Sequence, residues 1–256
     1  MKTSTILLAL ALASLTANAQ ITQWSDTAGD SAWSTSSNWS AGVPNSLSNV
    51  EIAMQPTADL IGIDTGGPVT VHSFVFDAAL TAPVEILPGT GAETLKVTAG
   101  ITNQDNNTHR FSLNVIAGGN ATYDAGVGGL TFDRLDINTR TISTSGAITI
   151  GTSIVFDLGS TAVFGSIGSV SVSGATIHIA GNYNGNAGDS FDLTTGDFSG
   201  ANIGQLPAIT GGLTWDTSQF FSQGILNVVP EPSVEALCGL GFALILYHWR
   251  RRQAVK

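Results

Sequence analysis

Apolar and polar residues alternate in short runs over most of the chain, from residue 50 to residue 229. The apolar members of each run are two positions apart, as in strands that bury one face, and Gly, Asn, Asp or Ser separates the runs. No part of this region has the repeat of apolar positions that an amphipathic helix needs. The pattern therefore predicts an all-β protein. The clearest runs are Phe111/Leu113/Val115, Ile148/Ile150, Ile154/Phe156, Val170/Val172 and Ile177/Ile179.

Two all-β architectures fit this pattern. A β-sandwich takes roughly 100 residues, so the region would form two sandwich domains. A parallel β-solenoid, or β-helix, would coil through about 20 residues or more per turn and bury one continuous apolar column. The short strands, the turns rich in Gly and Asn, and the lack of a Pro-Gly-rich linker favour the solenoid, over residues 50–229.

Residues 20–49 precede the regular runs and hold three tryptophans, Trp24, Trp33 and Trp39. The open end of a solenoid would expose its apolar column to water, so we expect this tryptophan-rich segment to form an N-terminal cap. Trp215 is expected to play the same part at the other end. Exposed aromatic rings also stack on sugars, so Trp24, Trp33 and Trp39 are candidates for glycan contact as well.

The first 19 residues have the pattern of a secretory signal peptide. Lys2 supplies the positive start, an apolar stretch runs from Ile6 to Leu15, and Ala17 and Ala19 form the small-x-small site before Gln20. Such a segment directs export and is removed from the mature protein. We therefore expect residues 1–19 to be cleaved off and to take no part in the fold.

The C-terminal segment pairs an apolar run with a basic end. Residues 233–249 would form a helix roughly 25 Å long, which makes one short transmembrane helix. Arg250, Arg251 and Arg252 follow it and would hold the C-terminus in the cytoplasm by the positive-inside rule. The alternative is an amphipathic core helix with a basic end.

Pro230, Glu231 and Pro232 stand directly before this segment. The order of the motif, the short span and the arginine cluster resembles the PEP-CTERM sorting signal of Gram-negative bacteria, over residues 230–256. The resemblance implies an exosortase as the processing partner, with cleavage near the motif. It also implies an association with extracellular polysaccharide and biofilm.

The N-terminal stretch "WSDTAGDSAWSTSSNWSAGVPNS" resembles the start of proteins with autotransporter-associated β-strand repeats. The stretch from Gly100 to Ile150 continues in the style of that repeat. This second resemblance implies the same β-solenoid as the strand pattern.

Composition and charge narrow the classes of function. Only 11% of residues are charged and the net charge is −10. Between residues 20 and 230 the only basic residues are Lys96, Arg110, Arg134 and Arg140. A surface so short of cations cannot neutralise phosphates, which excludes nucleic acid as a partner. The single cysteine, Cys238, allows no intramolecular disulfide.

Carboxylates that follow phenylalanine are the main candidates for chemistry: Asp77, Asp133, Asp157 and Asp192. An enzyme that cleaves polysaccharide needs two carboxylates at a defined separation. An Asp at a strand end more often accepts backbone hydrogen bonds in a turn. Asp136 lies three residues after Asp133, which places the two on opposite faces of a straight strand.

The segment "NYNGNAGD", from Asn182 to Asp189, has oxygen-bearing residues spaced as in a calcium loop, but it holds one carboxylate and also fits a β-turn. The chain has no GxSxG elbow, P-loop or GxGxxG motif. We therefore predict no catalytic residues, no metal site and no cofactor.

These observations favour an exported, non-enzymatic protein of the cell surface or extracellular matrix. Its precursor would be anchored in the inner membrane by the C-terminal helix and processed by an exosortase. The mature form would act at the cell surface or outside the cell, associated with exopolysaccharide. The alternatives are a carbohydrate-binding module that uses the N-terminal tryptophans, and a polysaccharide-cleaving β-helix enzyme.

Overall fold

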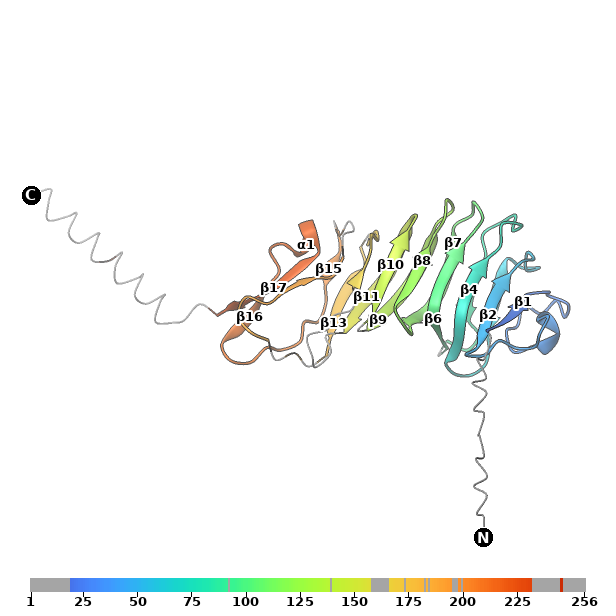
Figure 1. Cartoon of the computed structure of the whole chain (residues 1–256), viewed down its shortest axis with the longest axis horizontal. Helices are drawn as coiled ribbons and strands as arrows, with labels where there is room; N and C mark the ends of the chain where they lie inside the picture. Colours follow the sequence, from blue (N-terminus) through green and yellow to red (C-terminus); the bar gives the residue numbers. More distant parts are fainter. Residues whose placement is uncertain are drawn as a thin grey trace, which may run out of the picture.

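The structure is a computed structural model that describes residues 19–231 and residue 245, apart from residues 92, 139, 158–165, 173, 182, 184, 195–197 and 199. Its strands follow one another like the turns of a coil, from β1 near one end to β16 near the other (Figure 1). Neighbours in the stack are parallel: Val50 lies opposite Phe74, Phe74 opposite Ile101, and Ile101 opposite Tyr123. The chain is a parallel β-solenoid of about six turns, as the strand pattern predicts.

The turns build three faces, which we call A, B and C. Face A stacks β1 (Gln20–Gln23), β2 (Ser48–Ile52), the end of β4 (Val69–Phe76), the end of β6 (Thr94–Asn103), β8 (Ala121–Asp124), β10 (Thr141–Ser145) and β12 (Ser166–Ile167). Face B stacks β3 (Leu60–Ile63), β5 (Glu85–Pro88) and the starts of β7 (His109–Ala117), β9 (Leu130–Asn138) and β11 (Ile148–Asp157). Face C stacks the starts of β4 and β6, the ends of β7, β9 and β11, then β13 (Thr176–Ala180) and β15 (Asn202–Ile203).

The long strands bend from one face into the next. In β9, Phe132 and Leu135 are buried, whereas Asp133 and Arg134 between them both lie outside. The pairing register shifts at this place against both neighbouring strands, as at a β-bulge. An extra residue in one strand bends it and changes which side chains face inward. This bend forms the corner between faces B and C in this turn.

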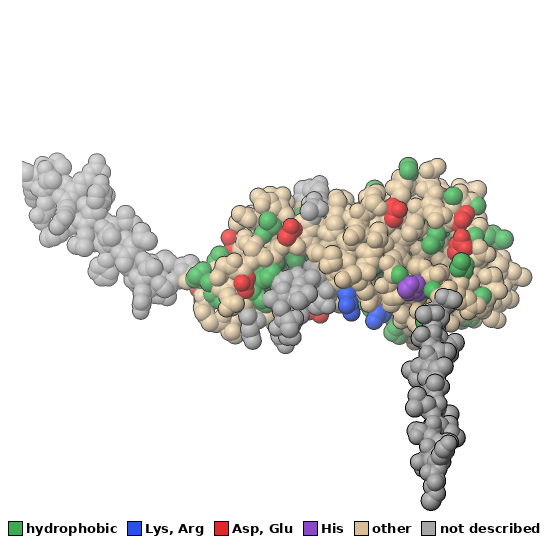
Figure 2. All heavy atoms as spheres, viewed as in Figure 1, with side chains coloured by type: hydrophobic (Ala, Val, Ile, Leu, Met, Phe, Trp, Pro, Cys, Tyr) green, Lys and Arg blue, Asp and Glu red, His purple; other side chains and the backbone are tan. Residues whose placement is uncertain are grey.

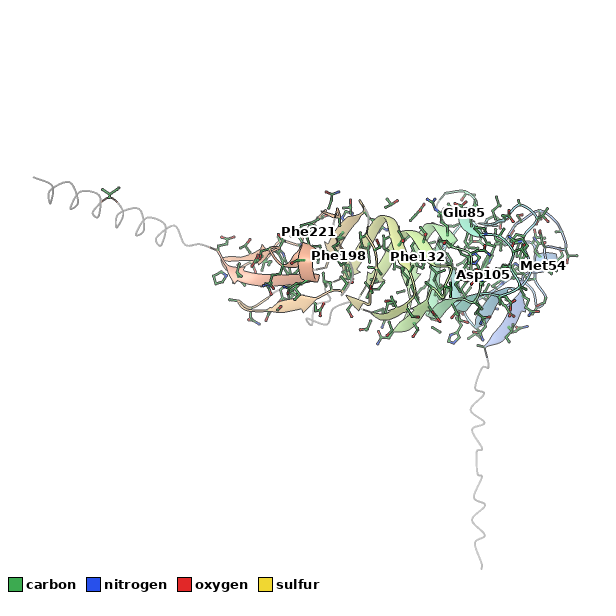
Figure 3. The ribbon with its side chains drawn as sticks, turned by 90° about the horizontal axis from the view of Figure 1, so that it is seen from above. Met54, Glu85, Asp105, Phe132, Phe198 and Phe221 are labelled. Atoms are coloured by element: carbon green, nitrogen blue, oxygen red, sulfur yellow. The ribbon has the colours of Figure 1, made fainter. Side chains whose placement is uncertain are left out.

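The interior is a column of apolar side chains. Phe132 is fully buried and stacks on Phe111 with ring centroids 5.1 Å apart. Phe111 in turn lies 5.5 Å from Phe74, and Phe132 lies 5.8 Å from Tyr123. Aromatic rings from consecutive turns therefore touch one another along the axis, and Phe132 is inside the middle turns (Figure 3).

The C-terminal end changes from parallel to antiparallel pairing. The segments β14 (Ser190–Asp192), β17 (Ile225–Pro230) and β16 (Leu213–Asp216) form a separate antiparallel sheet, and β14 precedes β15 in the chain. Helix α1 (Phe220–Gln223) buries Phe220, whose ring lies 5.5 Å from that of Phe198 (Figure 3). A parallel stack that simply stopped would leave an unpaired strand edge and bare apolar core. Of these elements, β16, α1 and β17 follow the last parallel strand in the chain and cover this end of the solenoid.

The two predicted targeting segments fall mostly outside the described residues. Residues 1–18 of the predicted signal peptide and residues 232–244 and 246–256 of the C-terminal segment are not among them. Among the residues that the structure describes, no helix is long and apolar enough to cross a membrane.

Removing one ring of the aromatic column tests the core. We expect Phe132→Ala to lower the free energy of unfolding by about 3–5 kcal/mol, because it leaves a cavity between stacked turns. Val127 is 86% exposed, so Val127→Ala is the control and should change stability by less than about 0.5 kcal/mol. Urea titration followed by circular dichroism measures both. Equal, small effects of the two variants would contradict a packed column at Phe132.

Candidate functional site

The three N-terminal tryptophans pack against one another. Trp24 and Trp33 are almost fully buried, and Trp39 is 4% exposed. The rings of Trp24 and Trp33 each meet Trp39 edge-on, with centroids 4.9 and 4.7 Å apart, and Trp33 also stacks on Phe74 at 6.4 Å. Trp39 donates its indole N–H to the carbonyl of Trp33 at 2.8 Å.

This burial corrects the expectation that Trp24, Trp33 and Trp39 contact glycan. A ring that stacks on a sugar must offer an open face, and these rings face one another and the first turns of the solenoid. Their contacts are those of a cap. Trp215, at the other end, is only partly buried and lies 5.7 Å from Tyr183 and 6.0 Å from Phe191.

Acidic side chains in the cap hold its loops. Asp30 accepts hydrogen bonds from the Ala32 backbone N–H (3.1 Å), the Thr35 hydroxyl (2.8 Å) and the Asn38 amide (2.6 Å). These donors favour the ionised form, so the pKa of the Asp30 carboxyl lies below its usual value. Asp64 similarly accepts from the backbone and hydroxyl of Ser34. These carboxylates serve the local structure.

Among the carboxylates that follow phenylalanine, Asp77 accepts a hydrogen bond in a turn and Asp133 forms an ion pair. Asp77 accepts the Ala79 N–H at 2.8 Å, which is the expected turn. Asp133 binds the Arg110 guanidinium at 2.7 Å. Asp136 pairs with Arg134 at 2.9 Å and accepts a hydrogen bond from Asn114 at 2.9 Å.

The expectation that Asp133 and Asp136 lie on opposite faces of a strand was wrong. Both are on the outside of the solenoid, because the bend in β9 places two successive residues outside between Phe132 and Leu135. Each carboxylate has its own arginine partner. The two are therefore neutralised separately instead of being held as an acid–base pair.

The segment with calcium-like spacing uses its carboxylate internally. Asp189 accepts hydrogen bonds from the Tyr183 hydroxyl and from the Asn186 backbone N–H. These bonds keep the pKa of Asp189 below its usual value, and burial together with the carboxylate raises the pKa of Tyr183 to about 12. Asn182 and Asn184 are outside the described residues. No group of three or more His, Cys, Asp or Glu among the described residues is placed to hold a metal ion.

A buried histidine, His109, is a feature that the sequence pattern did not single out. Its Nδ1 accepts the Val84 backbone N–H at 3.0 Å, so Nε2 carries the proton and donates to Asp105 at 3.0 Å. The ring stacks on Phe76 with centroids 3.9 Å apart and has no accessible surface. Burial lowers the pKa of His109 despite the opposing charge of Asp105. The neutral ring thus ties a corner of the coil to the preceding turn.

The predicted sorting motif begins where the last described strand ends. Pro230 closes β17 and pairs with Leu213 of β16, and the Glu231 N–H donates to the Gly212 carbonyl at 2.8 Å. Pro232 and the arginines 250–252 lie outside the described residues. At the other predicted processing point, Gln20 starts β1 and its N–H donates to the Leu47 carbonyl at 3.0 Å, whereas Ala17 is not described.

Comparison with known proteins adds no identification. No family model, curated protein or solved structure matches the chain. The resemblances to PEP-CTERM proteins and to autotransporter-associated repeats therefore stay predictions from sequence.

The His109 arrangement predicts a pH dependence of stability. Because the folded protein lowers the pKa of His109, the unfolded chain takes up a proton below about pH 6.5 that the folded chain does not. The contribution of neutral His109 to the free energy of unfolding is fully present above that pH. It falls by about 1 kcal/mol as the pH is lowered from 7.5 to 5.5.

Carboxylates also respond to pH, so the readout is the difference between the natural protein and His109→Gln, which retains one donor and one acceptor. The urea midpoint should fall more between pH 7.5 and pH 5.5 for the natural protein than for the variant. The same fall in both would show that His109 does not titrate as inferred.

Proposed function

We propose that this chain is an exported, non-enzymatic protein of the cell surface or extracellular matrix, sorted through its C-terminal PEP motif by an exosortase. Its mature part would be the β-solenoid, associated with extracellular polysaccharide. The precursor would pass through the inner membrane by its signal peptide and stay there by its C-terminal segment until processing.

The junction between β17 and the motif is the observation that carries this proposal. All described strands lie before Glu231, and the antiparallel sheet at the end of the solenoid is complete at Pro230. A cut beyond the motif would therefore remove none of these strands. The order of fold, motif and arginine cluster suits a detachable address.

The carboxylate environments favour a non-enzymatic role over the polysaccharide-cleaving alternative. Asp77 is used in a turn, and Asp133 and Asp136 are held by separate arginines. Hydrolysis of a glycosidic bond needs one acid with a raised pKa beside a second free carboxylate. In the described part, every Asp with a clear displacement of its pKa has it lowered: Asp30, Asp124, Asp189 and Asp216.

A substitution in the motif tests the sorting proposal. In the native host, we expect Pro232→Ala to leave full-length protein in the inner membrane, because Pro232 keeps Glu231 extended for the processing enzyme. Pro207→Ala, in a loop outside the motif, is the matched control and should be processed normally. Cell fractionation and the mass of the mature protein are the measurements. Equal processing of both variants would contradict the proposal.

A further inference from the structure

A hollow of about 480 Å³ lies on the outside of the solenoid, where face C passes into face A. Three successive turns line it, through Ala99, Asn120, Ala121, Thr122, Thr141 and Ser143. It is wide open to solvent, so it is a shallow groove and not an enclosed pocket. The middle of the visible face, over β8 and β10, consists mostly of uncharged polar side chains and backbone (Figure 2).

Small residues create the hollow. A Cβ atom on Gly100 would come within 2.4 Å of the Thr122 carbonyl oxygen, and one on Gly119 within 2.5 Å of the Thr98 carbonyl oxygen. These close backbone approaches admit only glycine. Ala99 adds only one methyl group, and Ala121 faces the core, so the corner stays recessed.

Polar groups in the hollow have unused hydrogen-bonding capacity. The hydroxyls of Thr122, Thr141 and Ser143 are on exposed residues and make no side-chain hydrogen bond within the described part of the chain. The side-chain oxygen Oδ1 of Asn120 accepts the Thr141 N–H at 2.9 Å, and the NH₂ group of the same side chain makes no hydrogen bond within the described part of the chain. The surface therefore offers donors and acceptors that the protein itself does not need.

The hollow continues along the axis of the solenoid. Thr122 lies opposite Ser143, and Thr141 opposite Ser166, in consecutive parallel strands. A second hollow of about 260 Å³ shares Thr141 and Ser143 with the first and extends to Ser166 and Thr194. Neighbouring strands are about 4.7–4.9 Å apart, so each pair presents two hydroxyl groups at that spacing. The two pairs lie in neighbouring rows, and Gly100 precedes Thr122 in the first row. An extended polymer could meet both pairs as it crosses these strands.

The chemistry of this groove selects among polymers. The first hollow has no charged lining residue, and the one charged residue that lines the second is the acidic Asp192. The protein is also acidic as a whole, so a polyanion is repelled there. A peptide strand needs an unpaired strand edge, whereas β8 is paired with both β6 and β10. A linear neutral polysaccharide presents hydroxyl groups along its whole length and carries no charge to desolvate.

We infer that the groove formed by β6, β8, β10 and β12 on face A binds a linear neutral polysaccharide. This inference rests on the proposed function, because only an exported protein meets such a polymer. The glycan would then contact hydroxyl side chains in the middle of the solenoid. This site is separate from Trp24, Trp33 and Trp39.

Affinity electrophoresis of the full chain in a non-ionic detergent tests this inference. Hydroxyethyl cellulose in the gel should retard the natural protein, and polygalacturonate at the same concentration should not. The double variant Thr122→Val, Ser143→Ala removes two hydroxyls with little change of shape. Its apparent association constant with hydroxyethyl cellulose should fall about tenfold, as expected for two lost hydrogen bonds to neutral groups.

The matched control is Thr70→Val, Thr94→Val, which removes two hydroxyls from the outside of face C. It should be retarded like the natural protein, and thermal melting should show that both double variants fold. Retardation by polygalacturonate alone, no retardation at all, or equal retardation of the two double variants would overturn the inference. Normal export and processing of the Thr122→Val, Ser143→Ala variant would then show that the sorting proposal stands separately.

Discussion

Stacking of each turn on the next is the interaction on which the rest of this structure depends. A single turn buries almost nothing by itself, whereas two turns in register share backbone hydrogen bonds and side-chain contacts such as that between Phe111 and Phe132. The same stacking leaves two ends that need covering. The chain closes one with interlocked tryptophans and the other with an antiparallel sheet and Phe220.

Function in this fold belongs to the outside and to the ends, because the inside is filled by apolar side chains. The described carboxylates near strand ends mostly accept hydrogen bonds in turns or pair with arginines. They therefore stabilise the fold. What remains is the hollow on face A, which is lined by small and uncharged polar residues and has Asp192 near one end. This hollow suits the proposed role, in which the chain is exported and presents a long surface outside the cell.

Alternation of apolar residues, as at Ile154 and Phe156, was enough to predict strands. The choice of a solenoid over two sandwiches needed the short strands, the turns rich in Gly and Asn, and the lack of a linker. The bends were not predictable in the same way. Asp133 and Asp136 share the outside because Asp133 and Arg134 in β9 both face outward, opposite an extra residue in each neighbouring strand. Strand periodicity assumes strict alternation and cannot show this. Buried His109 is hydrogen-bonded to Asp105 and to the backbone of Val84 in the preceding turn. No local sequence motif predicts these contacts. The sequence predicted that the tryptophans lie at one end of the solenoid. It did not show whether their rings are buried or exposed.

Distances between spin labels along face A test the parallel stack most directly. Asn49, Ser73, Gly100, Thr122 and Ser143 occupy successive positions in one ladder. Labels at positions 49 and 122 are then three strand spacings apart, about 14 Å before the label tethers are added, and labels at 49 and 143 are four apart, about 19 Å. Double electron–electron resonance should give narrow distributions that lengthen by about one strand spacing from the first pair to the second. Broad distributions, or a second pair no farther apart than the first, would contradict the solenoid.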